Sequence, residues 1–89
     1  MLAHIGYHNF IKVEKVLAIT SLKTAQEKRA REDALDERRY IDCTSDKQTR
    51  SLIFLQGGYV VGSSFVPQTL VERINNAGAL PIGRYEGTE

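Results

Sequence analysis

The sequence IDCTSDKQTRSLIFLQGGYVV, residues 41–61, contains three apolar runs that are separated by two turns of different character. The second turn, Gly57-Gly58, lies between Leu-Ile-Phe-Leu and Tyr-Val-Val. Two glycines between strand-like runs are typical of a β-hairpin, because type I′ and II′ turns need positive φ angles. The first turn, residues 44–49, is longer and carries no apolar side chain. We therefore expect a polar loop and three strands, at residues 40–44, 50–56 and 59–62.

The chain before this segment predicts further strands. Residues 2–7 have the pattern of a strand, and extended structure resumes at residues 10–11 after a break at His8-Asn9. Residues 16–20, Val-Leu-Ala-Ile-Thr, form a nearly continuous apolar run. Such a run is typical of a strand that is buried on both faces.

A long helix is predicted between residues 22 and 39, which contain no Pro or Gly and many good helix formers. Thr24 and Glu27 have the spacing of a capping box, in which a hydroxyl and a carboxylate accept hydrogen bonds from the first backbone N–H groups. The apolar face of this helix is thin, so we expect the helix at the surface. Its charged side is then either a solvated face or a contact surface between subunits.

A second, shorter helix is predicted to start at Pro67, because a proline at the first helical position loses no hydrogen bond. Leu70, Val71 and Ile74 form its apolar stripe, and Ala77-Gly78 closes it. Residues 79–89 show no period and are predicted to be a tail after a single domain, residues 1–78. The expected fold is α+β: a small, mostly antiparallel sheet of four to five strands with one long and one short helix.

Length and composition limit the class of protein. A chain of 89 residues makes one small domain with a thin margin of stability, so oligomerisation is a plausible source of further stability. The single cysteine, Cys43, excludes an internal disulfide and is expected to be a buried, reduced thiol. No apolar run approaches the roughly 18 residues of a membrane span, and the N-terminus has no signal-peptide pattern. We expect a cytoplasmic protein without membrane contact.

Catalytic and metal-binding patterns are weak. His4 and His8 are the only histidines. Four residues along a strand place them roughly 13 Å apart, too far to share a metal ion. The sequence has no CxxC, HExxH or phosphate-loop motif. We therefore expect no enzyme, no metal site and no cofactor, and no residue indicates a small-molecule ligand.

The polar loop is the candidate site. Lys47 and Arg50 flank Gln48 and Thr49, and these are the side chains that commonly contact DNA phosphates. Lys15, in the first connection, is expected on the same side of the sheet. The alternative, which residue types alone leave open, is an ordinary solvated loop. One protomer has few cations for DNA, but a closed assembly would multiply its contacts.

Residues spread over most of the chain resemble a known family. They are His4-Ile5-Gly6-Tyr7 with Asn9, Val16-Leu17-Ala18-Ile19, Lys28-Arg29 with Ala34, Ile41-Asp42-Cys43-Thr44, Thr49-Arg50, Val60-Val61 with Ser63-Ser64, and Pro67-Gln68-Thr69-Leu70 with Arg73. Their order and spacing, from about residue 2 to 74, resemble the RemA-type extracellular matrix regulators, which are small bacterial proteins.

The resemblance implies a non-enzymatic transcriptional regulator that assembles into homo-oligomeric rings and binds double-stranded DNA. It places a basic family position at Lys15, an arginine pair at Lys47 and Gln48, and an arginine at Arg50. This chain departs from the family pattern at two positions. Gln48 lacks the positive charge of the family's arginine, and Asp46 adds a negative charge where the family usually has a glycine. The alternative is an oligomeric structural or protein-interaction module with weak or no DNA binding, which uses the charged helix and the tail.

Overall fold

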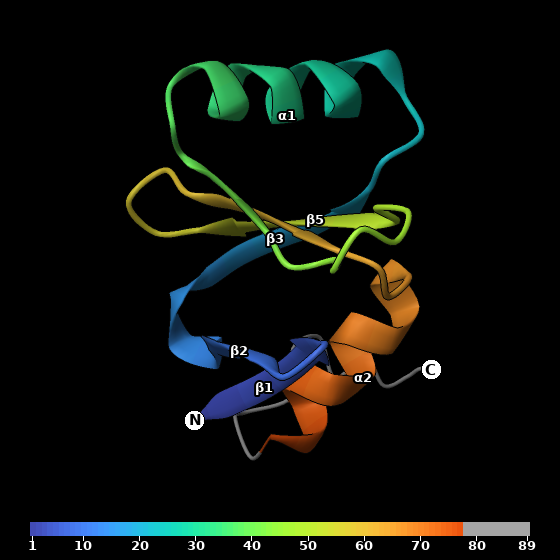
Figure 1. The fold of residues 1–89 in the computed structure, drawn as a ribbon. Helices are drawn as coiled ribbons and strands as arrows, with labels where there is room; N and C mark the ends of the chain where they lie inside the picture. The colour runs from blue at the N-terminus through green and yellow to red at the C-terminus, as the bar shows by residue number, and fades with distance from the viewer. Residues whose placement is uncertain (78–89) are drawn as a thin grey trace.

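A computed structural model describes residues 1–77 of the chain as three layers (Figure 1). A four-stranded sheet forms the middle layer, one helix covers its upper face, and a two-stranded sheet with the second helix covers its lower face. The elements are β1 (Leu2–Gly6), β2 (Asn9–Lys12), the 3-10 turn η1 (Val13–Lys15), β3 (Val16–Ser21), α1 (Ala25–Asp36), β4 (Tyr40–Asp42), β5 (Ser51–Leu55), β6 (Val60–Ser63) and α2 (Pro67–Asn76). The α+β class is confirmed.

The four-stranded sheet has the order β3-β5-β6-β4. β3 pairs antiparallel with β5, and β5 with β6, through the tight turn at Gly57 and Gly58, whose φ angles are +92° and +88°. The hairpin predicted from these glycines is confirmed. β4 joins the opposite edge and runs parallel to β6, so the sheet is mostly antiparallel as predicted.

The N-terminal strands form a hairpin of their own, because β1 and β2 pair only with each other. Tyr7 and His8, at φ +50° and +65°, make its two-residue turn. The side-chain amide of Asn9 donates to the carbonyls of Gly6 and Tyr7 at 3.0 and 3.3 Å, which holds the turn closed. The break expected at His8-Asn9 is therefore a hairpin turn.

β3 corrects one expectation. Its apolar run indicated a strand buried on both faces, but β3 is an edge strand without a fully buried residue. Leu17 is 66% exposed, and the pairing with β5 shifts between Val16 and Ala18. A continuous apolar run describes only the side chains, and the number of neighbouring strands depends on pairings distant in sequence.

Two hydrophobic clusters lie on the two faces of the sheet. The larger one, below, joins the sheet to β1, β2 and α2 and includes Ile5, Ile53, Val61, Leu70 and Ile74. The cluster above is small, because Ala34 is the only buried residue of α1, with Leu52 and Val60 beneath it. This confirms that α1 lies at the surface over a thin apolar face.

The predicted capping box of α1 is present in full. The N–H of Glu27 donates to Thr24 Oγ1 at 3.1 Å, and Glu27 Oε1 accepts from the N–H groups of Thr24 and Lys23 at 3.0 and 2.8 Å. These two backbone bonds, the one from Thr24 foremost, lower the pKa of Glu27 to about 2.

The Glu27 pKa predicts a pH dependence of folding. Since the pKa falls from 4.5 to about 2 on folding, the carboxylate stabilises the protein fully above the higher value. This contribution is lost as the pH drops from about 5 through about 2. We expect Glu27→Gln to lower the unfolding temperature at pH 7 and to have a flatter profile below pH 5. Profiles of equal slope for the two proteins would contradict this role.

The predicted tail, residues 79–89, and its boundary with the domain lie outside the described residues. No helix within residues 1–77 is long and apolar enough to cross a membrane.

Candidate nucleic-acid interface

The polar loop between β4 and β5 is held at both ends by hydrogen bonds to β6. The N–H of Cys43 donates to the carbonyl of Gly62 at 2.9 Å, and the N–H of Arg50 donates to the carbonyl of Ser63, also at 2.9 Å. The loop therefore projects from a rigid part of the sheet, which fixes where its side chains begin.

A tight turn forms the first half of the loop. Asp42 Oδ1 accepts from the hydroxyl and the N–H of buried Thr44, at 2.6 and 2.9 Å, and these bonds lower the pKa of the Asp42 carboxyl. The N–H of Lys47 then donates to the Thr44 carbonyl at 3.0 Å, across Ser45 and Asp46. Asp42 thus caps the turn as a carboxylate, and Lys47 begins the exposed part of the loop.

Ser45 and Asp46 both have positive φ angles, +53° and +69°, a region that costs most residues about 1–2 kcal/mol relative to glycine. We expect Asp46→Gly to raise the free energy of unfolding by about 0.5 kcal/mol, because the glycine gain is partly offset by greater freedom of the unfolded chain. If the polar loop contacts DNA, as the resemblance implies, removing the anion beside Lys47 should also strengthen DNA binding at low salt. Ser45→Gly is the matched control, because it also places a glycine at a positive φ angle but leaves the charge of the loop unchanged. If both variants gained the same DNA affinity, the gain could not come from removing the negative charge of Asp46, and this prediction would be wrong.

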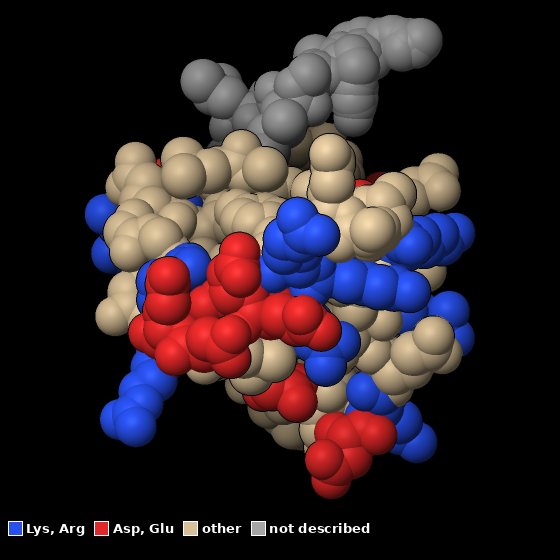
Figure 2. All heavy atoms as spheres, turned by 90° about the horizontal axis from the view of Figure 1, so that it is seen from above, with Lys and Arg blue, Asp and Glu red and all other residues tan. Residues whose placement is uncertain are grey.

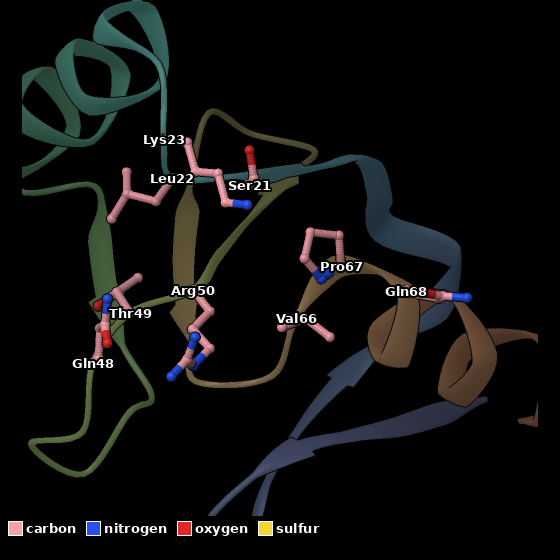
Figure 3. Close-up of a pocket in the computed structure, with 9 residues that line it drawn as sticks. All are labelled: Ser21, Leu22, Lys23, Gln48, Thr49, Arg50, Val66, Pro67 and Gln68. Carbon is pink, nitrogen blue, oxygen red and sulfur yellow. The ribbon is translucent and has the colours of Figure 1, made fainter.

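The second half of the loop lines a cleft of about 550 Å³ (Figure 3). Three segments that are distant in sequence form its walls. They are the end of β3 with the residues after it (Ser21, Leu22 and Lys23), the loop (Gln48, Thr49 and Arg50), and the start of α2 (Val66, Pro67 and Gln68). The Gln68 side chain extends away from the others, and the Arg50 guanidinium points away from Lys23, although both residues line the cleft (Figure 3). The loop thus presents Lys47 outward and Arg50 at the cleft.

Lys15 lies at the other end of the sheet. It directly precedes β3, and its carbonyl accepts from the N–H of Gln56 at 2.9 Å, beyond the end of β5. Arg50 directly precedes β5, at the end where Ser21 pairs with Ser51. Because Lys15 lies opposite Gln56, the two ends are separated by the six residue steps from Arg50 to Gln56, about 20 Å at 3.3 to 3.4 Å per residue. One protomer therefore brings Lys47, Gln48 and Arg50 together and holds Lys15 apart from them.

The cations at both positions are exposed. Within residues 1–77 the ion pairs are Met1–Glu14 and Glu37–Arg39, and neither involves Lys15, Lys23, Lys47 or Arg50. Acidic side chains gather instead on α1, where Figure 2 shows them as a patch with Lys and Arg beside it. The net charge of +1 is therefore the balance of this acidic patch and many exposed cations, among them those of the polar loop.

Cys43 is a buried free thiol, as predicted, and burial raises its pKa. In the described part of the chain, no group of three or more His, Cys, Asp or Glu side chains is arranged to hold a metal ion.

Lys23 was not recognised as a candidate from the sequence, where it reads as part of the long helix. The helix begins only at Ala25, and Lys23 lies in the connection that reaches the polar loop. The capping box at Thr24 was the available signal, because it leaves the preceding residue outside the helix.

Comparison with known proteins shows which family the chain resembles. Residues 2–74 match the model of the RemA-like family, described as extracellular matrix regulatory protein A-like. The chain is 34% identical over 73 residues to proteins named "putative regulatory protein" in Bacillus cytotoxicus, Bacillus mycoides and Bacillus cereus. The match covers 82% of this chain and 84% of each of these relatives.

The chain belongs to the RemA-like family. The resemblance seen in the sequence is therefore confirmed, and the relatives named above are described as regulatory proteins. In this RemA-like chain the matched region contains the whole polar loop, the cleft and Lys15.

Proposed function

We propose that this RemA-like protein is a DNA-binding transcriptional regulator that assembles as a ring of identical subunits. Lys47 and Arg50 contact phosphates from the polar loop, Gln48 adds a polar contact, and Lys15 supplies a separate phosphate contact. The observation that carries the proposal is a loop of exposed, unpaired cations fixed to a rigid sheet in a regulatory family. Arg and Lys side chains held in this way suit the phosphate backbone.

The separation of Lys15 from the loop supports a surface with repeated contacts. A single protomer has two small basic sites about 20 Å apart, at 3.3 to 3.4 Å per strand residue. The same spacing corresponds to about six base pairs of B-DNA, at 3.4 Å for each step along one strand. Subunits arranged side by side would continue this pattern along a duplex, while the acidic patch on α1 faces elsewhere.

A salt series with a generic duplex tests the proposal. Each neutralised phosphate contributes roughly −0.9 to the slope of log K against log salt concentration. Three cations in one protomer give a slope of about −2.7 on that basis, and a ring gives a steeper one. We expect a slope steeper than about −4, together with a particle size above that of a monomer. No binding at low salt would overturn the proposal.

A structural or protein-interaction module is the second candidate, and the edge strand β3 favours it. The sequence of β3, VLAITS, contains no charge and no proline, and Leu17 is largely exposed. Natural edge strands usually carry such protective residues, and β3 has only the irregularity between Val16 and Ala18, so the rest of this edge is suited to pairing with another chain. Assembly that persists without any binding to DNA in the salt series would favour this candidate.

A further inference from the structure

The cleft beside the polar loop has two walls of different chemistry. Lys23 and Arg50 supply the cationic wall, and neither side chain has an ion-pair partner within residues 1–77. The apolar walls are Leu22 on one side of the cleft and Val66 with Pro67 on the other, and Val66 remains 43% exposed (Figure 3). An exposed apolar side chain next to unpaired cations matches a ligand that has both an anionic and an apolar part.

The start of α2 adds to the cationic wall. Pro67 occupies the first turn of the helix, no side chain caps it, and the first turn has no acidic residue. The N–H groups of the first turn have no partner inside a helix, and they carry the positive end of its dipole. Pro67 and Gln68 line the same cleft as Lys23 and Arg50, so the positive end of the α2 dipole adds to the attraction for anions that the two side chains create.

The size of the cleft selects among anions. Its volume of about 550 Å³ lies within the range of roughly 300–1,000 Å³ that small-molecule sites have. An inorganic phosphate would occupy a small part of this space and leave the apolar wall uncovered.

We propose that this cleft binds a phosphate ester of nucleotide size. The phosphate lies between Lys23 and Arg50, and the organic part covers Leu22 and Val66. Two sources share this chemistry: a free nucleotide, and one nucleotide unit of a nucleic-acid strand. Binding of the ester does not depend on the proposed function, but since Arg50 serves both sites, a bound nucleotide and duplex DNA compete if that function holds.

The test uses adenosine 5′-monophosphate as the probe and the full chain as the protein. Amide chemical shifts of residues in the three cleft segments are followed during titration with this nucleotide, with adenosine and with inorganic phosphate. We expect the nucleotide to bind at least tenfold more tightly than either control. Equal binding of adenosine and its monophosphate would overturn the phosphate assignment.

Two variants test the walls of the cleft. Lys23→Gln should weaken nucleotide binding about tenfold, whereas Lys28→Gln, which removes the same charge from α1, should leave it unchanged. Val66→Asp provides an independent test, because an aspartate is a good N-cap for α2 but places an anion in the cleft. It should raise the unfolding temperature and abolish nucleotide binding. If the unfolding temperature and the nucleotide affinity both fell, Val66 would be needed only for the stability of the fold, and the proposal would be contradicted.

Duplex DNA distinguishes the two sources. If the free nucleotide does not bind but Lys23→Gln lowers duplex affinity several-fold more than Lys28→Gln does, the cleft holds a nucleotide unit of the strand. If the nucleotide binds and DNA does not, the cleft assignment stands and the proposed DNA function fails. If Lys23→Gln changes the affinity for neither the nucleotide nor duplex DNA, the cleft proposal is overturned. It is also overturned if the protein binds neither of these ligands.

Discussion

Reversing the charges of Lys47 and Arg50 together, to Lys47→Glu and Arg50→Glu, is expected to lower the affinity for duplex DNA on the order of 100-fold at 0.1 M salt. On the proposed function, this variant removes two phosphate contacts and places two anions against the DNA backbone instead. The salt slope should become shallower by about 2, from roughly 0.9 for each lost contact. In a ring the loss recurs in every subunit, so the effect on the assembled protein is larger.

The control for this variant carries the same change of net charge elsewhere. Lys28→Glu with Arg29→Glu reverses two exposed cations on α1, outside the loop and the cleft. We expect a small, salt-sensitive loss of affinity from this pair. Equal losses in the two proteins would mean that overall charge, rather than the loop, governs binding, and an unchanged affinity in the loop variant would show the site assignment to be wrong.

Gly62→Ala is expected to have the largest effect on stability. A Cβ at Gly62 would overlap the hydroxyl of Tyr40 and would lie 3.4 Å from Thr49 Cγ2. Tyr40 belongs to the small cluster above the sheet, and the Arg31 guanidinium lies 5.7 Å from the centre of its ring. The ring must leave this position, and we expect a loss of about 2–3 kcal/mol in the free energy of unfolding. For a domain of this size that corresponds to roughly 10–20 °C in unfolding temperature.

A double-mutant cycle isolates this clash. Tyr40→Ala removes the ring that a side chain at position 62 would meet, so adding Gly62→Ala to it should cost less than about 1 kcal/mol. Additive losses in the double variant would mean that the backbone of β6, rather than Tyr40, requires glycine. Denaturant unfolding of the four proteins supplies all the terms of the cycle.

Local rules determined several features of this protein from the sequence alone. The Gly57-Gly58 turn, the capping box of Thr24 and Glu27, and the start of α2 at Pro67 were all predicted and are present. Each depends on backbone conformation and hydrogen bonds within a few residues, so the neighbouring side chains suffice to specify it. The α+β class and the family membership follow from the sum of such signals along the chain.

Tertiary structure alone decided how these elements meet. The apolar run of β3 fits a central strand or an edge strand equally well, and β3 lies at the edge because it pairs with β5 alone, while β5 also pairs with β6. The same pairings put Lys15 at one end of the sheet and bring Lys23 to Arg50 at the other. The requirement for glycine at position 62 also comes from a neighbour 22 residues away, Tyr40, across the parallel pairing of β4 with β6. Strand order and register depend on contacts between segments distant in sequence, and no local pattern contains that information.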